Sequence, residues 1–205
     1  MRYQLIAFLL IFGVFSFCSS GIAQETDMLF FGQPALITPV GQSADGLMVN
    51  VLCRQSKIAV VYNGFANTDT LRAYLAGEIE MPVSARRYGP IKSLILVPGG
   101  STKGLGAAKI DEKWEMDRVN NLIAGARELE MPIAVCHIGG VARRGSLSDP
   151  FNQIAAEVAD VIIVVQGGDD DNFFKDIAEV RGVPYHLVEN MPDIGDVLWE
   201  YFREK

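Results

Sequence analysis

Polar residues and glycines gather in four segments of the sequence, each directly after a short apolar run. They read Gly41-Gln42-Ser43-Ala44-Asp45, Gly99-Gly100-Ser101-Thr102-Lys103-Gly104, Gly139-Gly140-Val141-Ala142-Arg143-Arg144 and Gly167-Gly168-Asp169-Asp170-Asp171. Glycines allow backbone N–H groups to approach a ligand closely, and a helix that begins after such a segment favours an anionic group at its N-terminus. The segments therefore predict a binding site for a small polar or anionic molecule.

The side chains in these segments supply the chemistry of such a site. The candidate ligand-binding residues are Gln42, Ser43, Asp45, Gly99, Gly100, Ser101, Thr102, Lys103, Gly104, His137, Gly139, Gly140, Arg143 and Arg144. We expect Lys103 to hold an anionic group and Arg143 or Arg144 to close over it, because a guanidinium matches a carboxylate or phosphate bidentately. His137 is the side chain there that could change protonation near neutral pH.

The same residues also have a purely structural interpretation. Glycine is a usual residue of tight turns. Ser43, Ser148 and Asp149 could cap helices, and Arg143 and Arg144 could be solvated. Both interpretations are open from the sequence.

Known nucleotide and metal motifs are incomplete in this chain. Gly99 to Gly104 is not a P-loop, which needs a glycine four residues before Gly-Lys-Ser/Thr. Gly104-Leu105-Gly106 begins a dinucleotide-like pattern, but Lys109 stands where the third small residue belongs. Asp169 to Asp171 is more typical of a solvated loop or a helix N-terminus than of a cation site. No metal site is predicted, and any cofactor is unknown.

A cysteine nucleophile is a second chemical hypothesis, with Cys136 and His137 as the candidate catalytic residues. Both follow an apolar run and precede an expected helix, where the pKa of a thiol can be lowered. Ile138 opposes this hypothesis, because a tight nucleophile turn needs a small residue two positions after the nucleophile. The alternative is a strand that continues through Cys136 and buries the sulfur. A disulfide with Cys53 is possible in an exported protein, but two small buried side chains are the commoner arrangement.

Alternating strand and helix patterns must position these residues. Continuous apolar runs, rich in β-branched residues, cover 35–40, 58–62, 93–97, 133–138, 161–165 and 185–188. Such runs are typical of strands buried on both faces. Helical patterns cover 45–55, 68–75, 112–130, 149–159, 173–180 and 194–204. This alternation predicts an α/β fold, a three-layer doubly wound (Rossmann- or flavodoxin-like) sandwich with a mostly parallel sheet of about six strands.

Ligands of an open parallel sheet bind beyond the carboxyl ends of its strands. We therefore expect the four glycine-rich segments to converge on one edge of the sheet, called the rim below. The helix over 112–130 should turn one apolar stripe to the sheet, formed by Trp114, Val119, Leu122, Ile123 and Ala126. The segment 76–92 interrupts the alternation and is expected to be an irregular excursion with loops or short strands.

The N-terminus predicts export. A positive Arg2 precedes the apolar run Leu5 to Phe17, and small residues then lead to a cleavage point after Ala23. The run is shorter than the about 18 residues of a membrane span. A lipid anchor on Cys18 is the other alternative, but the bulky Phe17 stands where lipoprotein signals place a small residue.

The expected organisation is thus a signal peptide over 1–23 and a single α/β domain over 24–205. The mature protein would be periplasmic or secreted, with no stable membrane anchor after cleavage. The formal net charge of −7 argues against nucleic acid as a partner, because nucleic acids select basic surfaces. A small polar or anionic molecule is the expected partner.

Two short motifs resemble the DJ-1/PfpI group of the class I glutamine amidotransferase-like fold. They are Pro98-Gly99-Gly100 at one strand end and Ala134-Val135-Cys136-His137 one helix later. In that group a strand ends in Ala-x-Cys-His-Gly, whereas Ile138 follows His137 here. The resemblance implies a cysteine-dependent enzyme with Cys136 as nucleophile and Asp45 as a loose counterpart of the family's acidic residue.

Longer strings resemble an exported bacterial family of unknown function. They are Gly41 to Asp45, Gly99 to Ala108 and His137 to Asp149, which read GQSAD, GGSTKGLGAA and HIGGVARRGSLSD. This resemblance implies the fold and export, and it brings no activity. Three hypotheses follow: an exported small-molecule binding protein, which leads; a cysteine-dependent enzyme; and a periplasmic protein-interaction module.

Overall fold

One all-parallel sheet organises the chain. The structure, a computed structural model, describes residues 29–203, so the expected signal peptide lies outside the described residues. The sheet runs in the order β2-β1-β3-β4-β5-β6, and every neighbouring pair is parallel. Its strands are β1 (Ala35–Val40), β2 (Val60–Tyr62), β3 (Ser93–Pro98), β4 (Ile133–His137), β5 (Val161–Val165) and β6 (Tyr185–Val188).

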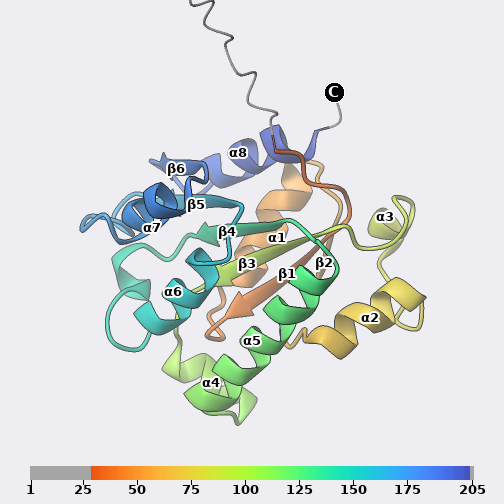
Figure 1. The fold of residues 1–205 in the computed structure, drawn as a ribbon, viewed down its shortest axis with the longest axis horizontal. Coiled ribbons are helices and arrows are strands. Elements are labelled where there is room, and N and C mark those ends of the chain that lie inside the picture. Colours follow the sequence, from red (N-terminus) through yellow and green to blue (C-terminus); the bar gives the residue numbers. More distant parts are fainter. Residues whose placement is uncertain (1–28, 204–205) are drawn as a thin grey trace, which may run out of the picture.

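Helices cover both faces of the sheet, which confirms the expected three-layer doubly wound fold (Figure 1). They are α1 (Asp45–Gln55), α2 (Thr68–Ala76), α3 (Val83–Arg86), α4 (Thr102–Ala108), α5 (Glu112–Glu128), α6 (Asp149–Ala156), α7 (Phe173–Arg181) and α8 (Asp193–Phe202), with a 3₁₀ turn η1 (Gly140–Arg143). Because side chains alternate along a strand, Leu36 belongs to the core on the face covered by α2, α5, α6 and α7, whereas Ile37 belongs to the core on the face covered by α1 and α8. No helix among residues 29–203 is long and apolar enough to cross a membrane.

The strand order reverses between β1 and β3, which makes this pair the switch point of the sheet. After β1 the chain forms β2 on one side, and it then crosses to form β3 on the other. The two strands pair over six positions, from Ala35 opposite Ser93 to Val40 opposite Pro98. In an open parallel sheet, this crevice is where ligands usually bind.

The excursion over 76–92 is irregular, with the single-turn helix α3 and no strand. Two other expectations about local structure need correction. The segment Thr102–Ala108, expected as a loop, is helix α4, because the Ser101 hydroxyl caps it by accepting from Gly104 N–H at 3.0 Å. Trp114 does not belong to the buried stripe of α5. It is 47% exposed, and its ring meets that of Phe65 edge to face at 6.4 Å.

Candidate functional site

The loops after β1 and β3 are hydrogen-bonded to each other at the rim, which fills the crevice at the switch point. Gly99 N–H donates to Val40 O and Ser101 N–H donates to Gly41 O, both at 2.9 Å. A Cβ atom on Gly41, whose φ is +100°, would lie 2.8 Å from Gly99 O. Glycine is therefore required at this position by the approach of two backbones to each other.

A buried ion pair supports the loop after β1 from the side of α5. Glu115 is fully buried and Arg118 nearly so, and their side chains meet at 2.7 Å. Arg118 also donates to Pro39 O at 2.7 Å and Ala66 O at 2.6 Å, while Glu115 accepts from Gly41 N–H at 3.0 Å. Because each charge has several partners, the cost of removing both from water is offset.

The sequence analysis missed this pair, although a signal for it was present. Glu115 and Arg118 lie three residues apart on the buried side of α5, and they stand four residues before Val119 and Leu122 respectively. Two opposite charges on an apolar helix face indicate a buried ion pair rather than a solvated surface.

Gln42 faces the interior of the protein. Its backbone is left-handed, with φ 59°. Its amide donates to both Glu115 carboxylate oxygens, at 3.2 and 3.1 Å, and to Gly64 O at 2.9 Å. The amide nitrogen of Gln42 is thus engaged by protein partners, and the role of Gln42 as a ligand-binding residue stays a prediction.

Arg143 and Asp45, two candidate ligand-binding residues, form an ion pair at the rim. Arg143 Nε donates to Asp45 Oδ2 at 3.1 Å, and the Arg143 side chain remains 27% exposed. It lies across Gly99 and Gly139, where an added Cβ would stand 3.0 Å from its Cδ and 2.0 Å from its Cγ respectively. Its Nη1 makes one long contact of 3.5 Å with Gly100 O, and its Nη2 has no hydrogen-bond partner among residues 29–203.

Arg144 has a different environment from its neighbour. It donates to Asp149 at 2.9 Å, to Asp171 at 2.8 Å and to Gly168 O at 2.8 Å, and it lies 4.6 Å from the centre of the Phe173 ring. The hydrogen bond from Arg144 lowers the pKa of Asp171 to about 2. Arg144 already pairs with two carboxylates within the protein, and the expectation that it closes over a ligand stays a prediction.

His137 is buried beneath the rim. Its Nε2 lies 3.3 Å from Gly140 O, and its ring centre lies 4.8 Å from that of Phe174. A Cβ on Gly168 would stand 2.6 Å from the imidazole. Burial lowers the pKa of His137, so the ring is neutral at pH 7.

Cys136 lies inside β4 with its side chain fully buried. Burial raises the pKa of this thiol well above its ordinary value, and it raises the pKa of Cys53 to about 12. Both cysteines are free thiols. The strand continues through Cys136 as the alternative interpretation expected, and burial of the sulfur opposes a nucleophilic role for it.

The remaining candidate residues of the rim either form hydrogen bonds within the protein or are exposed. The Ser101 hydroxyl caps α4, and Gly100 N–H donates to Ser148 Oγ at 3.0 Å. Thr102 and Lys103 are exposed in the first turn of α4. Lys103 makes no ion pair within the described part of the chain. It is therefore an available cation at the rim.

Asp169 also forms hydrogen bonds within the protein. It accepts from Phe174 N–H at 2.7 Å, from Lys175 N–H at 3.0 Å and from the Tyr185 hydroxyl at 2.7 Å. It thus caps the N-terminus of α7, consistent with the helix-terminus interpretation. Over residues 29–203, no group of three or more His, Cys, Asp or Glu side chains is arranged to hold a metal ion.

Three buried polar atoms at the rim lack a hydrogen-bond partner among the described residues. They are Ser43 Oγ, His137 Nδ1 and Asn152 Oδ1. Asn152 joins this group to the arginine loop, since its Nδ2 donates to Arg143 O at 3.0 Å. An unsatisfied buried polar atom costs about 1–3 kcal/mol. Ser43 follows β1, His137 ends β4 and Asn152 lies in the first turn of α6.

Fold and site together define a flavodoxin-like, doubly wound α/β domain with a closed polar rim. The chain belongs to a family described as a domain of unknown function (DUF6305), whose model matches residues 32–202. This membership agrees with the expected family of unknown function. It does not bear on the three sequence strings or on the DJ-1/PfpI resemblance.

Other comparisons add little. No protein of curated function matches the sequence. One solved structure, an archaeal fructose-1,6-bisphosphate aldolase with its catalytic Lys covalently bound to the carbinolamine intermediate of the substrate, is 13% identical, with 83% of this chain and 84% of that chain covered. Its TM-score of 0.31 supports no conclusion about fold or activity.

Proposed function

We propose that this domain binds a small anionic molecule at the rim, with Arg143 as the principal cation. The observation that supports this function is the position of the Arg143 side chain, which packs over Gly99 and Gly139 and is 27% exposed. The three unsatisfied buried polar atoms belong to the same edge of the sheet.

Hydrogen bonding leaves part of the guanidinium free for a ligand. Asp45 engages only Nε of Arg143, so the outer nitrogens remain as donors. A carboxylate or a phosphate accepts two parallel N–H bonds from such a group. Lys103, in the first turn of α4, supplies a second positive charge from the neighbouring loop. Gln42 and Arg144 are left out of the proposed site because protein groups already engage them.

A titration with two simple anions tests this function. Inorganic phosphate or citrate should stabilise the purified protein in thermal unfolding, and a ligand at 100 times its Kd adds about 2.7 kcal/mol. Arg143→Gln should weaken binding about tenfold in calorimetry, because it removes charge-assisted hydrogen bonds. Lys103→Gln should weaken it less, because Lys103 contributes a solvated point charge.

Arg72→Gln is the matched control, since Arg72 is an exposed arginine on α2 paired only with Glu128. Circular dichroism without ligand establishes that each variant is folded. Binding by Arg143→Gln and Lys103→Gln that equals that of Arg72→Gln would reject the proposed site.

We propose also that the domain works outside the cytoplasm. The support is the N-terminal sequence, in which an apolar run from Leu5 to Phe17 is followed by small residues up to Ala23. A binding function fits that location, because it needs no nucleotide cofactor.

A further inference from the structure

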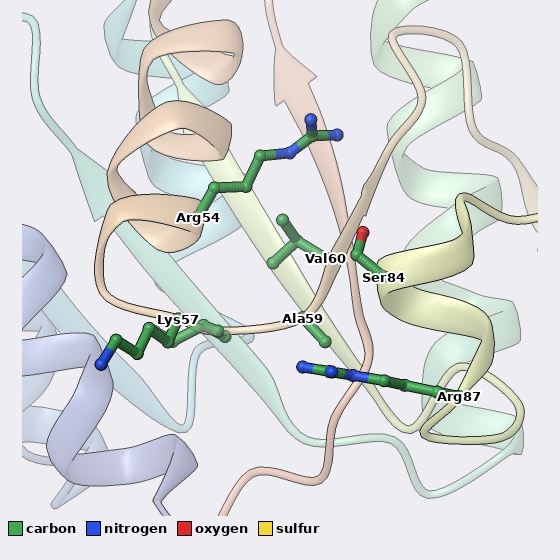
Figure 2. A pocket seen from close by; sticks show the side chains of 7 residues that line it. Arg54, Lys57, Ala59, Val60, Ser84 and Arg87 are labelled. Atoms are coloured by element: carbon green, nitrogen blue, oxygen red, sulfur yellow. The ribbon is translucent and has the colours of Figure 1, made fainter.

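A second cationic site lies at the amino end of β2, the opposite end of this strand from the rim. A cavity of about 410 Å³ is lined there by Arg54, Lys57, Ile58, Ala59, Val60, Ser84 and Arg87 (Figure 2). Its volume is within the range of small-molecule sites, about 300–1,000 Å³. The lining combines the end of α1, the edge strand β2 and the segment around α3.

Two guanidiniums reach over this cavity from opposite sides. Figure 2 shows Arg54 extending from α1 and Arg87 extending from the end of α3. The Ser84 hydroxyl lies on the same side as Arg87, and Lys57 Nζ is directed away from both guanidiniums. Arg87 contacts Tyr88, whose hydroxyl is 3.1 Å from Nη2 and whose ring centre is 4.9 Å from the guanidinium carbon.

The positive charge of the cavity is not compensated locally. Neither Arg54 nor Arg87 forms an ion pair within residues 29–203, and no Asp or Glu lines the cavity. This concentration of cations occurs in a chain whose formal net charge is −7. Uncompensated guanidiniums over a hollow are suited to an anionic guest.

The edge strand β2 adds one backbone donor, Val60 N–H, to the same cavity. Ala35 N–H donates to Ala59 O at 3.0 Å, and Asn63 N–H donates to Ile37 O at 3.0 Å. The backbone groups of Ala59 and Asn63 therefore face β1. The intervening Val60 therefore turns its N–H and C=O away from β1. Since β2 is the outermost strand, no strand of the sheet pairs with these groups.

We propose that this cavity binds an oxyanion, the carboxylate or phosphate group of a small molecule. Arg54 and Arg87 hold the anion from two sides, the Ser84 hydroxyl donates to it, and Val60 N–H points toward it from the strand. The site is separate from the rim, and its occupancy does not depend on Arg143.

Nuclear magnetic resonance of the purified protein tests the proposal with inorganic phosphate and, in a parallel titration, succinate. Both anions should shift the backbone amides of Val60 and Ser84, and the one that binds tighter identifies the preferred head group. Arg54→Gln and Arg87→Gln should each weaken this binding about tenfold. Arg72→Gln is the matched control and should leave it within about twofold, because Arg72 is an exposed arginine on α2 that does not line the cavity.

Each outcome decides the proposal. Absence of shifts at Val60 and Ser84 up to about 10 mM anion would overturn it, as would equal losses for Arg72→Gln and Arg54→Gln. The rim variant Arg143→Gln separates the two sites. Shifts at Val60 that persist in this variant support the cavity site even if rim binding is absent. Shifts confined to residues 99–104 and 139–143 support the rim and reject the cavity.

Discussion

At the scale of single residues, the ion pair of Glu115 and Arg118 is the contact on which the rim depends. It joins α5 to the backbone at Pro39, Gly41 and Ala66. Loss of one partner leaves a buried charge without compensation, which is among the most destabilising changes a folded protein undergoes.

Glu115→Gln should therefore lower the free energy of unfolding by about 3–5 kcal/mol, measured by urea denaturation. The exposed pair of Lys113 and Asp117 on the same helix is the control, with side chains 83% and 64% exposed. Asp117→Asn should change stability by less than about 1 kcal/mol. A loss for Glu115→Gln no larger than that of Asp117→Asn would show that the buried pair does not hold the rim.

At the scale of elements, helix α4 depends on two glycines in different ways. A Cβ on Gly104 would lie 1.9 Å from Gln42 O, whereas one on Gly106 would meet nothing within 4 Å. The first glycine permits α4 to pack against the loop after β1. Gly106 lowers the stability of α4, because glycine disfavours a helix by about 1 kcal/mol relative to alanine.

Gly104→Ala should accordingly destabilise the protein, whereas Gly106→Ala should stabilise it by up to about 1 kcal/mol. Differential scanning calorimetry of the two variants measures both effects against wild type. Unfolding temperatures that move in the same direction for both would contradict the close approach of α4 to Gln42.

The sequence predicted most elements because their patterns are local. The boundaries of β1, β5, β6 and α1 agree with the structure, since each is a buried run or an amphipathic period that neighbouring residues define. Helix α4 was missed because its glycines resemble a loop, and its cap forms through a single serine hydroxyl.

The candidate site was predicted less completely, because its contacts are not local. Asp45 begins α1 and Arg143 ends η1, and only the fold brings these distant residues together. Gln42 resembled a ligand donor in sequence because its true partner, Glu115, is more than 70 residues away. Whether a polar residue is free or engaged is decided by such distant contacts.

At the scale of the whole molecule, the N-terminal sequence predicts that the protein is exported. Expression in a bacterial host should give periplasmic protein whose first residue is Gln24, because cleavage is expected after Ala23. Intact-mass spectrometry of fractionated cells measures both. A retained Met1 in the cytoplasmic fraction would reject export, and a lipid-modified Cys18 would favour the lipoprotein alternative.

The pairing of β1 with β3 has a consequence for the order in which the chain folds. Strand β1 is interior to the sheet, and its partner β3 ends at Pro98, so β1 stays unpaired on that side until residue 98 of 205 is synthesised. Parallel pairings between distant segments form slowly, because loop closure precedes the contacts that reward it. We therefore expect the pair of β1 and β3 to form late in folding, after β3 is complete.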